Sequence, residues 1–253
     1  GEDTVIVDYA STVAADSFDL GDGSQDAVLF LASGGNPVSI NDEEDTTALG
    51  GITNTEVLGV FTNDGGATDV TVNMDRISQS AFFVRVDGVV TISEIDTGDT
   101  VVFYGQNDND NDNNNVLDNG DFNPSAVTAK DGITSMDLVL EASGEGGVDL
   151  DDSLTINGNA LTTVNLQSTS DDEAVTSSDD SNDVVLDFGA DVPSNTVTIN
   201  VSGDQDLDVS GVIGLTNSLT INASDFTAAL TATGTNQDDI ITGGSGNDTI
   251  TGG

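Results

Sequence analysis

Acidic residues and glycines near the C-terminal end of the chain recur with a spacing that suits calcium coordination. Residues 234–242 read Gly-Thr-Asn-Gln-Asp-Asp-Ile-Ile-Thr, and residues 243–251 read Gly-Gly-Ser-Gly-Asn-Asp-Thr-Ile-Thr, so the two nonapeptides align without a gap. In this pattern the glycine-rich part turns the chain, and the apolar eighth residue lies in a short strand. Carboxylates and turn carbonyls are the hard oxygen ligands that Ca²⁺ prefers. The residues expected to hold Ca²⁺ here are Asp239, Gly243, Gly244, Ser245, Gly246 and Asp248.

The first nonapeptide departs from the pattern because Thr235 and Gln237 stand where glycine is usual, which suits an opening repeat. Gly252 and Gly253 begin a third copy. Since two copies cannot bury a roll by themselves, we expect further copies in a longer parent protein. The alternative is a flexible tail rich in glycine and aspartate.

A second candidate for Ca²⁺ binding lies in a segment made almost entirely of Asn and Asp, residues 106–123. Its spacing fits the ligand positions of an EF-hand loop, with Asp instead of Glu at the last position. No flanking helices are apparent, so it would be the loop alone, and a metal-free spacer is the alternative. The candidate ligands are Asp110, Asp112, Asn114, Val116 (through its carbonyl), Asp118 and Asp121, with Asp108 opening an overlapping frame.

Composition excludes several classes of function. The 253 residues carry 46 acids against three cations, a net charge of −43, and the acids comprise 38 Asp and only eight Glu. With so few cations, we expect no binding to nucleic acid. Without His or Cys, the common nucleophilic triads and zinc sites are impossible. Few aromatics and no Trp leave little to stack on sugar rings, so we expect no enzyme. No apolar run approaches the ~18 residues of a transmembrane helix.

The elements that must position these ligands are short strands. Apolar runs flanked by turn-forming residues predict strands throughout the chain. They are Val5–Val7, Val28–Leu31, Val57–Phe61, Phe82–Val86, Val101–Tyr104, Leu138–Leu140 and Val184–Leu186. A weak helix signal covers Asn123 to Lys130. The tripeptide Thr-[Ile/Val]-Asn recurs, and its last two copies end at Asn200 and Asn222, a plausible distance for one coil of a solenoid or one hairpin of a sandwich. In a stacked coil, such Asn side chains would form a ladder at a corner.

These signals predict an all-β protein of stacked short strands, solenoid-like or sandwich-like, which ends in a calcium-binding parallel β-roll. Composition changes suggest four parts. They are an N-terminal β region at 1–105, a calcium-binding connector at 106–124, a second β region at 125–233, and the start of a nonapeptide array at 234–253.

The nonapeptides resemble those of the repeats-in-toxin (RTX) class of bacterial secreted proteins. Residues 17–30, 52–60 and 160–166 are similar, more loosely, to stacked-strand segments of type I-secreted surface-layer proteins and adhesins. The resemblance implies a bacterial cell-surface protein that folds on meeting Ca²⁺ outside the cell. It also implies several bound Ca²⁺ ions, an export signal beyond this chain, and no catalytic module.

We therefore expect a segment of a surface-layer (S-layer) protein, whose partners are copies of itself and, through other regions, the cell envelope. A second hypothesis is a segment of a large calcium-dependent adhesin. A third is an acidic extracellular protein of a halophile, whose carboxylates serve hydration, although the excess of Asp over Glu argues mildly against it.

Overall fold

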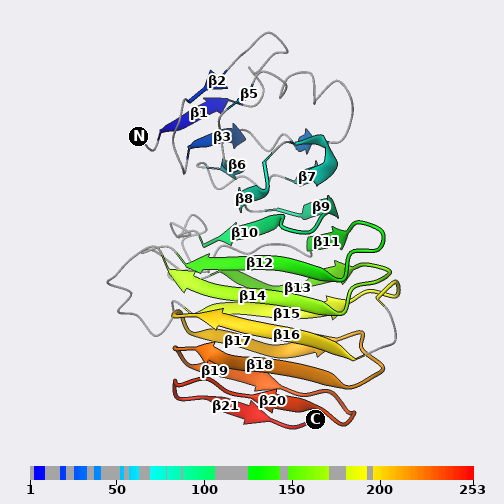
Figure 1. Ribbon diagram of the computed structural model, residues 1–253. Helices are drawn as coiled ribbons and strands as arrows, with labels where there is room; N and C mark the ends of the chain where they lie inside the picture. Colours follow the sequence, from blue (N-terminus) through cyan, green and yellow to red (C-terminus); the bar gives the residue numbers. More distant parts are fainter. Residues whose placement is uncertain are drawn as a thin grey trace.

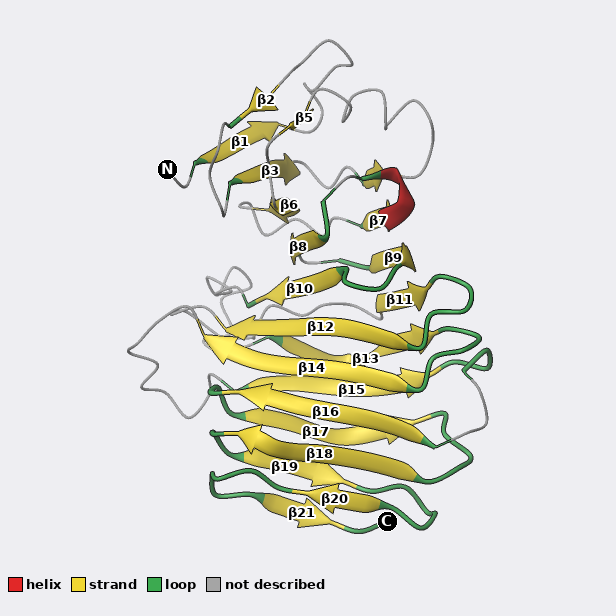
Figure 2. Ribbon diagram, in the orientation of Figure 1, coloured by secondary structure: helices red, strands yellow, loops and turns green. Residues whose placement is uncertain are grey.

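The chain folds into two stacked parallel β-sheets, seen in the computed structural model of Figure 1. Figure 2 shows that almost all of the regular structure is strand, and the described residues include one short 3-10 helix, η2 (Met74–Arg76). None of the helices that the structure describes is long and apolar enough to cross a membrane. The structure describes residues 3–8, 18–20, 26–32, 37–40, 52–53, 57–62, 69–77, 79–86, 88–105, 125–142, 148–170, 181–192 and 196–253.

The larger sheet, here sheet 1, has ten strands. In order they are β1 (Thr4–Asp8), β3 (Ala27–Ala32), β6 (Val57–Thr62), β8 (Ala81–Arg85), β10 (Thr100–Tyr104), β12 (Ser135–Ala142), β14 (Thr163–Ser170), β16 (Val197–Gly203), β18 (Leu219–Phe226) and β20 (Ile240–Thr242).

Sheet 2 has nine strands, and a separate pair is formed by β2 (Phe18–Asp19) and β5 (Ile52–Thr53). The strands of sheet 2 are β4 (Val38–Ile40), β7 (Val70–Asn73), β9 (Val90–Ile95), β11 (Ser125–Ala129), β13 (Asp149–Asn157), β15 (Asn182–Phe188), β17 (Leu207–Ile213), β19 (Leu230–Thr233) and β21 (Thr249–Thr251).

From β6 onward the chain alternates between the two sheets, so each coil adds one strand to each. The turns that connect the strands therefore collect at two opposite edges. We call edge I the one where turns lead from sheet 2 into sheet 1, and edge II the one where they lead from sheet 1 into sheet 2. Between β10 and β21, edge I lies on the right and edge II on the left in Figure 1.

The core lies between the sheets and is filled by alternate residues of every strand. In β8, Phe82 and Val84 are fully buried, whereas Ala81, Phe83 and Arg85 face outward and are half-buried. This period of two is the signature of a strand with one covered face. The core is mostly Val, Ile, Leu and Ala with a few Phe, as the composition requires.

The spacing of the Thr-[Ile/Val]-Asn repeat is the length of one coil, because Asn200 of β16 lies opposite Asn222 of β18. Asn165 of β14 occupies the same row. The Asn200 side chain donates through Nδ2 to Asn165 Oδ1 at 2.9 Å, and Asn165 donates to Asp137 Oδ1 at 2.6 Å. The expected ladder therefore exists, but it runs along the outward face of sheet 1 and not at a corner.

The expected all-β class is confirmed, and all seven predicted strands are present. The helix expected over Asn123 to Lys130 is wrong, since β11 covers Ser125–Ala129 with alternating burial. Both sheets continue from the N-terminal strands to the nonapeptides, and the expected boundaries near 105, 125 and 233 stay predictions.

Candidate cation-binding turns

The two nonapeptides each form one turn and one strand, as expected. Residues 234–239 turn the chain from β19 into β20, and residues 243–248 turn it from β20 into β21. In sheet 1 Thr220 pairs with Ile240, twenty residues on, and in sheet 2 Thr231 pairs with Thr249, eighteen residues on. One coil thus contains two nonapeptides.

Consequently the carboxylates of Asp239 and Asp248 lie on opposite edges of the protein, Asp239 on edge I and Asp248 on edge II. The nonapeptide pattern places Asp239 and Asp248 in one set of candidate Ca²⁺ ligands. In the fold, a turn contacts the turns one coil away on its own edge, so the two carboxylates belong to two separate candidate cation sites. Each would find its additional ligands in the turns stacked beside it.

The turn on edge I is closed by the Asp239 carboxylate. It accepts a hydrogen bond from the N–H of Leu219, in the preceding coil, at 2.8 Å. It also accepts one from Thr235 Oγ1 at 2.9 Å, within its own turn. Asp239 is half-buried. The carboxylate therefore ties its own turn to the neighbouring coil, and it lies beside the Thr235 hydroxyl of that turn.

The turn on edge II is packed closely against the preceding coil. The Asp248 carboxylate accepts from Leu230 N–H at 3.1 Å, and Ser245 N–H donates to Phe226 O at 3.0 Å. A Cβ atom at Gly246 would collide with the carbonyl oxygen of Ala228. Glycine is therefore required here so that the two turns can stack, and their stacking brings carbonyl oxygens close to the acidic turn.

The oxygen donors of these turns are of the kind that binds Ca²⁺: the carboxylate of Asp239 or Asp248 directly before the strand, hydroxyls and turn carbonyls. Among the described residues, no three acidic side chains converge on a point that could hold a metal ion. A cation at either edge would therefore depend on at most two carboxylates together with neutral oxygens. The seven candidate ligands of the connector, Asp108, Asp110, Asp112, Asn114, Val116, Asp118 and Asp121, lie outside the described residues.

The same hydrogen bond recurs in earlier coils, a feature that sequence reasoning missed. A polar side chain at the start of a strand, or directly before it, accepts a hydrogen bond from a backbone N–H. The donor is the residue at the equivalent position in an adjacent coil. The signal in the sequence is a short polar residue immediately before an apolar run. The further pairs are Asp3 N–H to Asp26 (2.8 Å), Val89 N–H to Asp69 (3.1 Å), Val90 N–H to Ser125 (3.1 Å), Val148 N–H to Asn182 (2.8 Å) and Ala229 N–H to Asp206 (2.8 Å).

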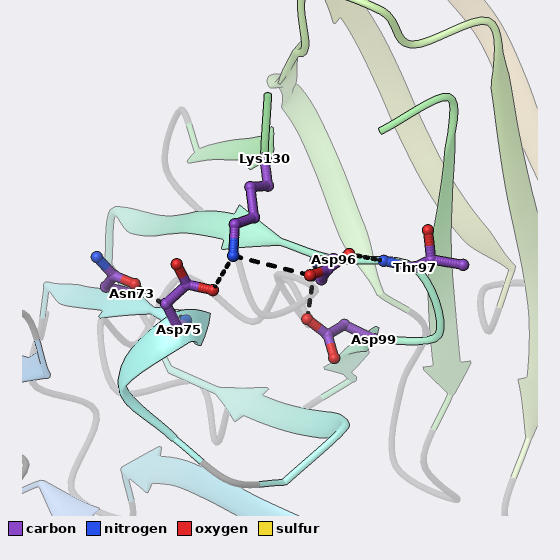
Figure 3. A network of polar contacts seen from close by, with 6 residues as sticks. All are labelled: Asn73, Asp75, Asp96, Thr97, Asp99 and Lys130. Carbon is purple, nitrogen blue, oxygen red and sulfur yellow. Dashed lines mark hydrogen bonds and ion pairs between the residues drawn. The ribbon is translucent and has the colours of Figure 1, made fainter. Parts of the chain in front are cut away.

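A cluster on edge I contains the only lysine of the chain (Figure 3). Lys130 Nζ lies 2.6 Å from Asp75 Oδ1 and 3.7 Å from Asp96 Oδ2. These three residues follow β11, β7 and β9, so they come from three consecutive coils. Asp99 closes the turn after β9 by accepting the N–H of Asp96 at 2.8 Å. An ammonium group here offsets carboxylates that the fold stacks on one edge.

The contacts in this cluster shift the pKa values of Lys130 and Asp99. The hydrogen bond to Asp75 raises the pKa of Lys130 above its ordinary value. Partial burial raises the pKa of the Asp99 carboxyl, and the charges of Asp96 and Asp75 act in the same direction, although the hydrogen bond from the Asp96 backbone opposes them. The cluster therefore favours a bound proton or another cation.

Comparison with known proteins gives no family. No family model matches the chain, and neither the curated proteins nor the solved structures contain a significant match.

Proposed function

We propose that this chain is a segment of a bacterial surface-layer protein whose folding and self-assembly depend on bound Ca²⁺. The observation that carries the proposal is the coil of two nonapeptides, which continues both sheets and places an aspartate, Asp239 or Asp248, directly before each of its strands. The function is structural, with no reaction to catalyse, and the place of action is the cell surface.

The charge of the chain supports a role for cations. A net charge of −43 opposes a compact state through self-repulsion. Neighbouring coils of a parallel sheet lie ~4.8 Å apart, so acids in equivalent turns are close. Of the three basic residues, Lys130 makes both ion pairs found among the described residues. Ca²⁺ bound at the turns would offset the remaining repulsion and rigidify the coils, so binding would contribute directly to folding.

In this mechanism the cation acts as a switch for export and assembly. At low cytosolic Ca²⁺ the repelling carboxylates would keep the chain from folding, which suits passage through a narrow type I secretion channel. Outside the cell Ca²⁺ would shift the equilibrium toward the folded state. Free Ca²⁺ at 100 times the dissociation constant of a site that forms only on folding adds about 2.7 kcal/mol.

The test is thermal unfolding, followed by circular dichroism, in Ca²⁺ and in chelator. We expect the midpoint to rise with Ca²⁺, and Asp239→Asn and Asp248→Asn each to reduce the rise. Asp238→Asn is the matched control, because Asp238 adjoins Asp239 but is exposed. Equal midpoints in Ca²⁺ and chelator would contradict the proposal. Equal stabilisation by molar KCl without Ca²⁺ would favour the halophile hypothesis.

Assembly separates the surface-layer hypothesis from the adhesin hypothesis. Electron microscopy after addition of Ca²⁺ should reveal ordered sheets or tubes of many copies if the chain forms a layer. Extended single molecules under the same conditions would favour an adhesin segment.

A further inference from the structure

The outward side of sheet 1 is apolar across several consecutive coils near the N-terminus. Burial alternates along each strand, so the outward residues are identified directly. We call the following outward, half-buried side chains of β3, β6, β8 and β10 the apolar face: Leu29, Leu31, Phe61, Phe83, Val102 and Tyr104. Ile6 of β1, paired with Leu29, extends it and is 58% exposed.

The apolar face is tightly built. Phe83 lies opposite Val102 on one side and Gly59 on the other, and Gly59 lies opposite Leu29. A Cβ atom at Gly59 would come within 2.8 Å of Phe83 Cβ and 2.9 Å of Leu29 Cδ2. The missing side chain therefore lets the two apolar residues close over the strand between them. The rings of Phe83 and Tyr104 also pack together, with centroids 5.0 Å apart.

Other outward surfaces of the same coils have a different character. In sheet 2 the outward residues at the equivalent level include Thr71, Thr91 and Ser93. The next strand of sheet 1, β12, carries two acids on its outward side, Asp137 and Glu141, with Val139 between them. These acids mark the border of the apolar face. Parallel strands that are apolar on both sides are typical of sheets with both sides covered. The apolar face thus has the composition of a covered surface.

Arg85 is the one cation of this surface. Its guanidinium lies 5.6 Å from the centroid of the Tyr104 ring, and its Nε is buried without a hydrogen-bond partner. Aromatic residues and arginine are enriched where proteins bind one another, and a buried donor without a partner is costly. A carboxylate arriving with a bound protein would satisfy this donor.

We propose that the apolar face binds the same face of a second copy of this chain, sheet against sheet. The net charge of the chain indicates which partner binds the apolar face. Two copies with a net charge of −43 repel each other over acidic surfaces, so they approach best where acids are absent. A cationic partner would instead be drawn to the acidic turns. A second copy also brings the carboxylates at the border of its own apolar face, Asp137 and Glu141, as partners for Arg85, and aligned packing of two sheets is a common geometry.

This inference rests on the proposed self-assembly and locates one of its contacts. The experiment is sedimentation velocity of the whole chain in Ca²⁺ and in chelator, with Phe83→Glu and Phe83→Lys. We expect both variants to weaken association about tenfold or more, because either charge would be buried against an apolar surface. Thr91→Glu, on the outward side of sheet 2, is the control and should associate as the unchanged chain does.

Because the chain has no cysteine, spin labels can report the contact directly in a folded protein. Labels on Val102→Cys should give short distances between copies, and labels on Thr91→Cys long ones. If the unchanged chain associates but both Phe83 variants associate equally well, or if the label distances are reversed, this contact is wrong while self-assembly stands. If the unchanged chain stays monomeric in Ca²⁺, the proposed assembly itself is wrong.

Discussion

Lys130 donates a hydrogen bond through Nζ to Asp75 Oδ1, 2.6 Å away and 55 residues earlier in the sequence. The two residues are separated by one complete coil, whose Asp96 also lies near the ammonium group. A single side chain therefore links three coils on edge I. It does so where the stacked turns would otherwise place carboxylates side by side.

Replacing Lys130 by Met should lower the unfolding midpoint at neutral pH, because Asp75 and Asp96 lose their counter-ion. The pKa of Lys130 is raised in the folded state above its ordinary 10.5. Its stabilising effect is thus complete at neutral pH and is lost as the pH rises through the folded-state pKa. Urea titrations at neutral and strongly alkaline pH measure the difference. Arg76→Met, which removes an exposed cation that takes part in neither ion pair, is the control.

Replacing Asp99 by Asn should slightly raise the midpoint of unfolding at neutral pH, measured by urea titration. The Asp99 pKa is raised from 3.8 in the folded state, so its ionised form opposes folding above that pKa. The amide oxygen of Asn still accepts the Asp96 N–H. The advantage should disappear as the pH falls through the folded-state pKa and Asp99 becomes protonated. Asp238→Asn removes one exposed charge elsewhere, and an equal gain there would assign the effect to net charge alone.

Replacing Gly246 by Ala should destabilise the last coil by about 1–3 kcal/mol, the usual cost of overpacking. The new methyl group would collide with the Ala228 carbonyl and separate the stacked turns. Gly252→Ala is the matched control, because a Cβ atom there meets nothing within 4 Å. Hydrogen exchange of residues 219–251 localises the loss. Similar exchange in both variants would contradict the stacked-turn geometry.

Replacing Asn182 by Leu should cost about 1–3 kcal/mol for each buried polar group that it leaves without a partner. The Asn182 side chain is fully buried, accepts from Val148 N–H at 2.8 Å, and donates to Leu140 O at 3.0 Å and to Ser168 Oγ at 2.9 Å. Gln167→Leu, at an exposed position one residue from Ser168, should be nearly neutral. Chemical denaturation of both variants measures the difference.

The sequence predicted the strands of sheet 1 better than those of sheet 2, for a physical reason. Val28–Leu31 and Val101–Tyr104 are apolar on both sides, so they stand out as continuous runs. Strands such as β9 and β11 place Thr, Ser or Ala on their outward side, which weakens the signal. A helix was expected over Asn123 to Lys130, but alternating burial against the core made β11 a strand.

The sequence predicted which residues form the candidate turns, but not where these turns lie relative to each other in the fold. The spacing of glycine and aspartate identified the turns at 234–239 and 243–248. It did not indicate their opposite edges, because that depends on how many residues complete a coil. The Lys130 cluster was not predicted either, since its members are distant in the sequence and meet only when three coils stack.

Because the last coil consists of two nonapeptides, the structure depends on whether the number of nonapeptides is odd or even. Each nonapeptide carries the chain half-way around, from one sheet to the other. Inserting one nonapeptide after Thr242 would transfer the turn of Asp248 to edge I and move its strand into sheet 1. Inserting two would restore every later residue to its original side, one coil further along. Odd and even insertions should therefore give different surfaces from the same repeat.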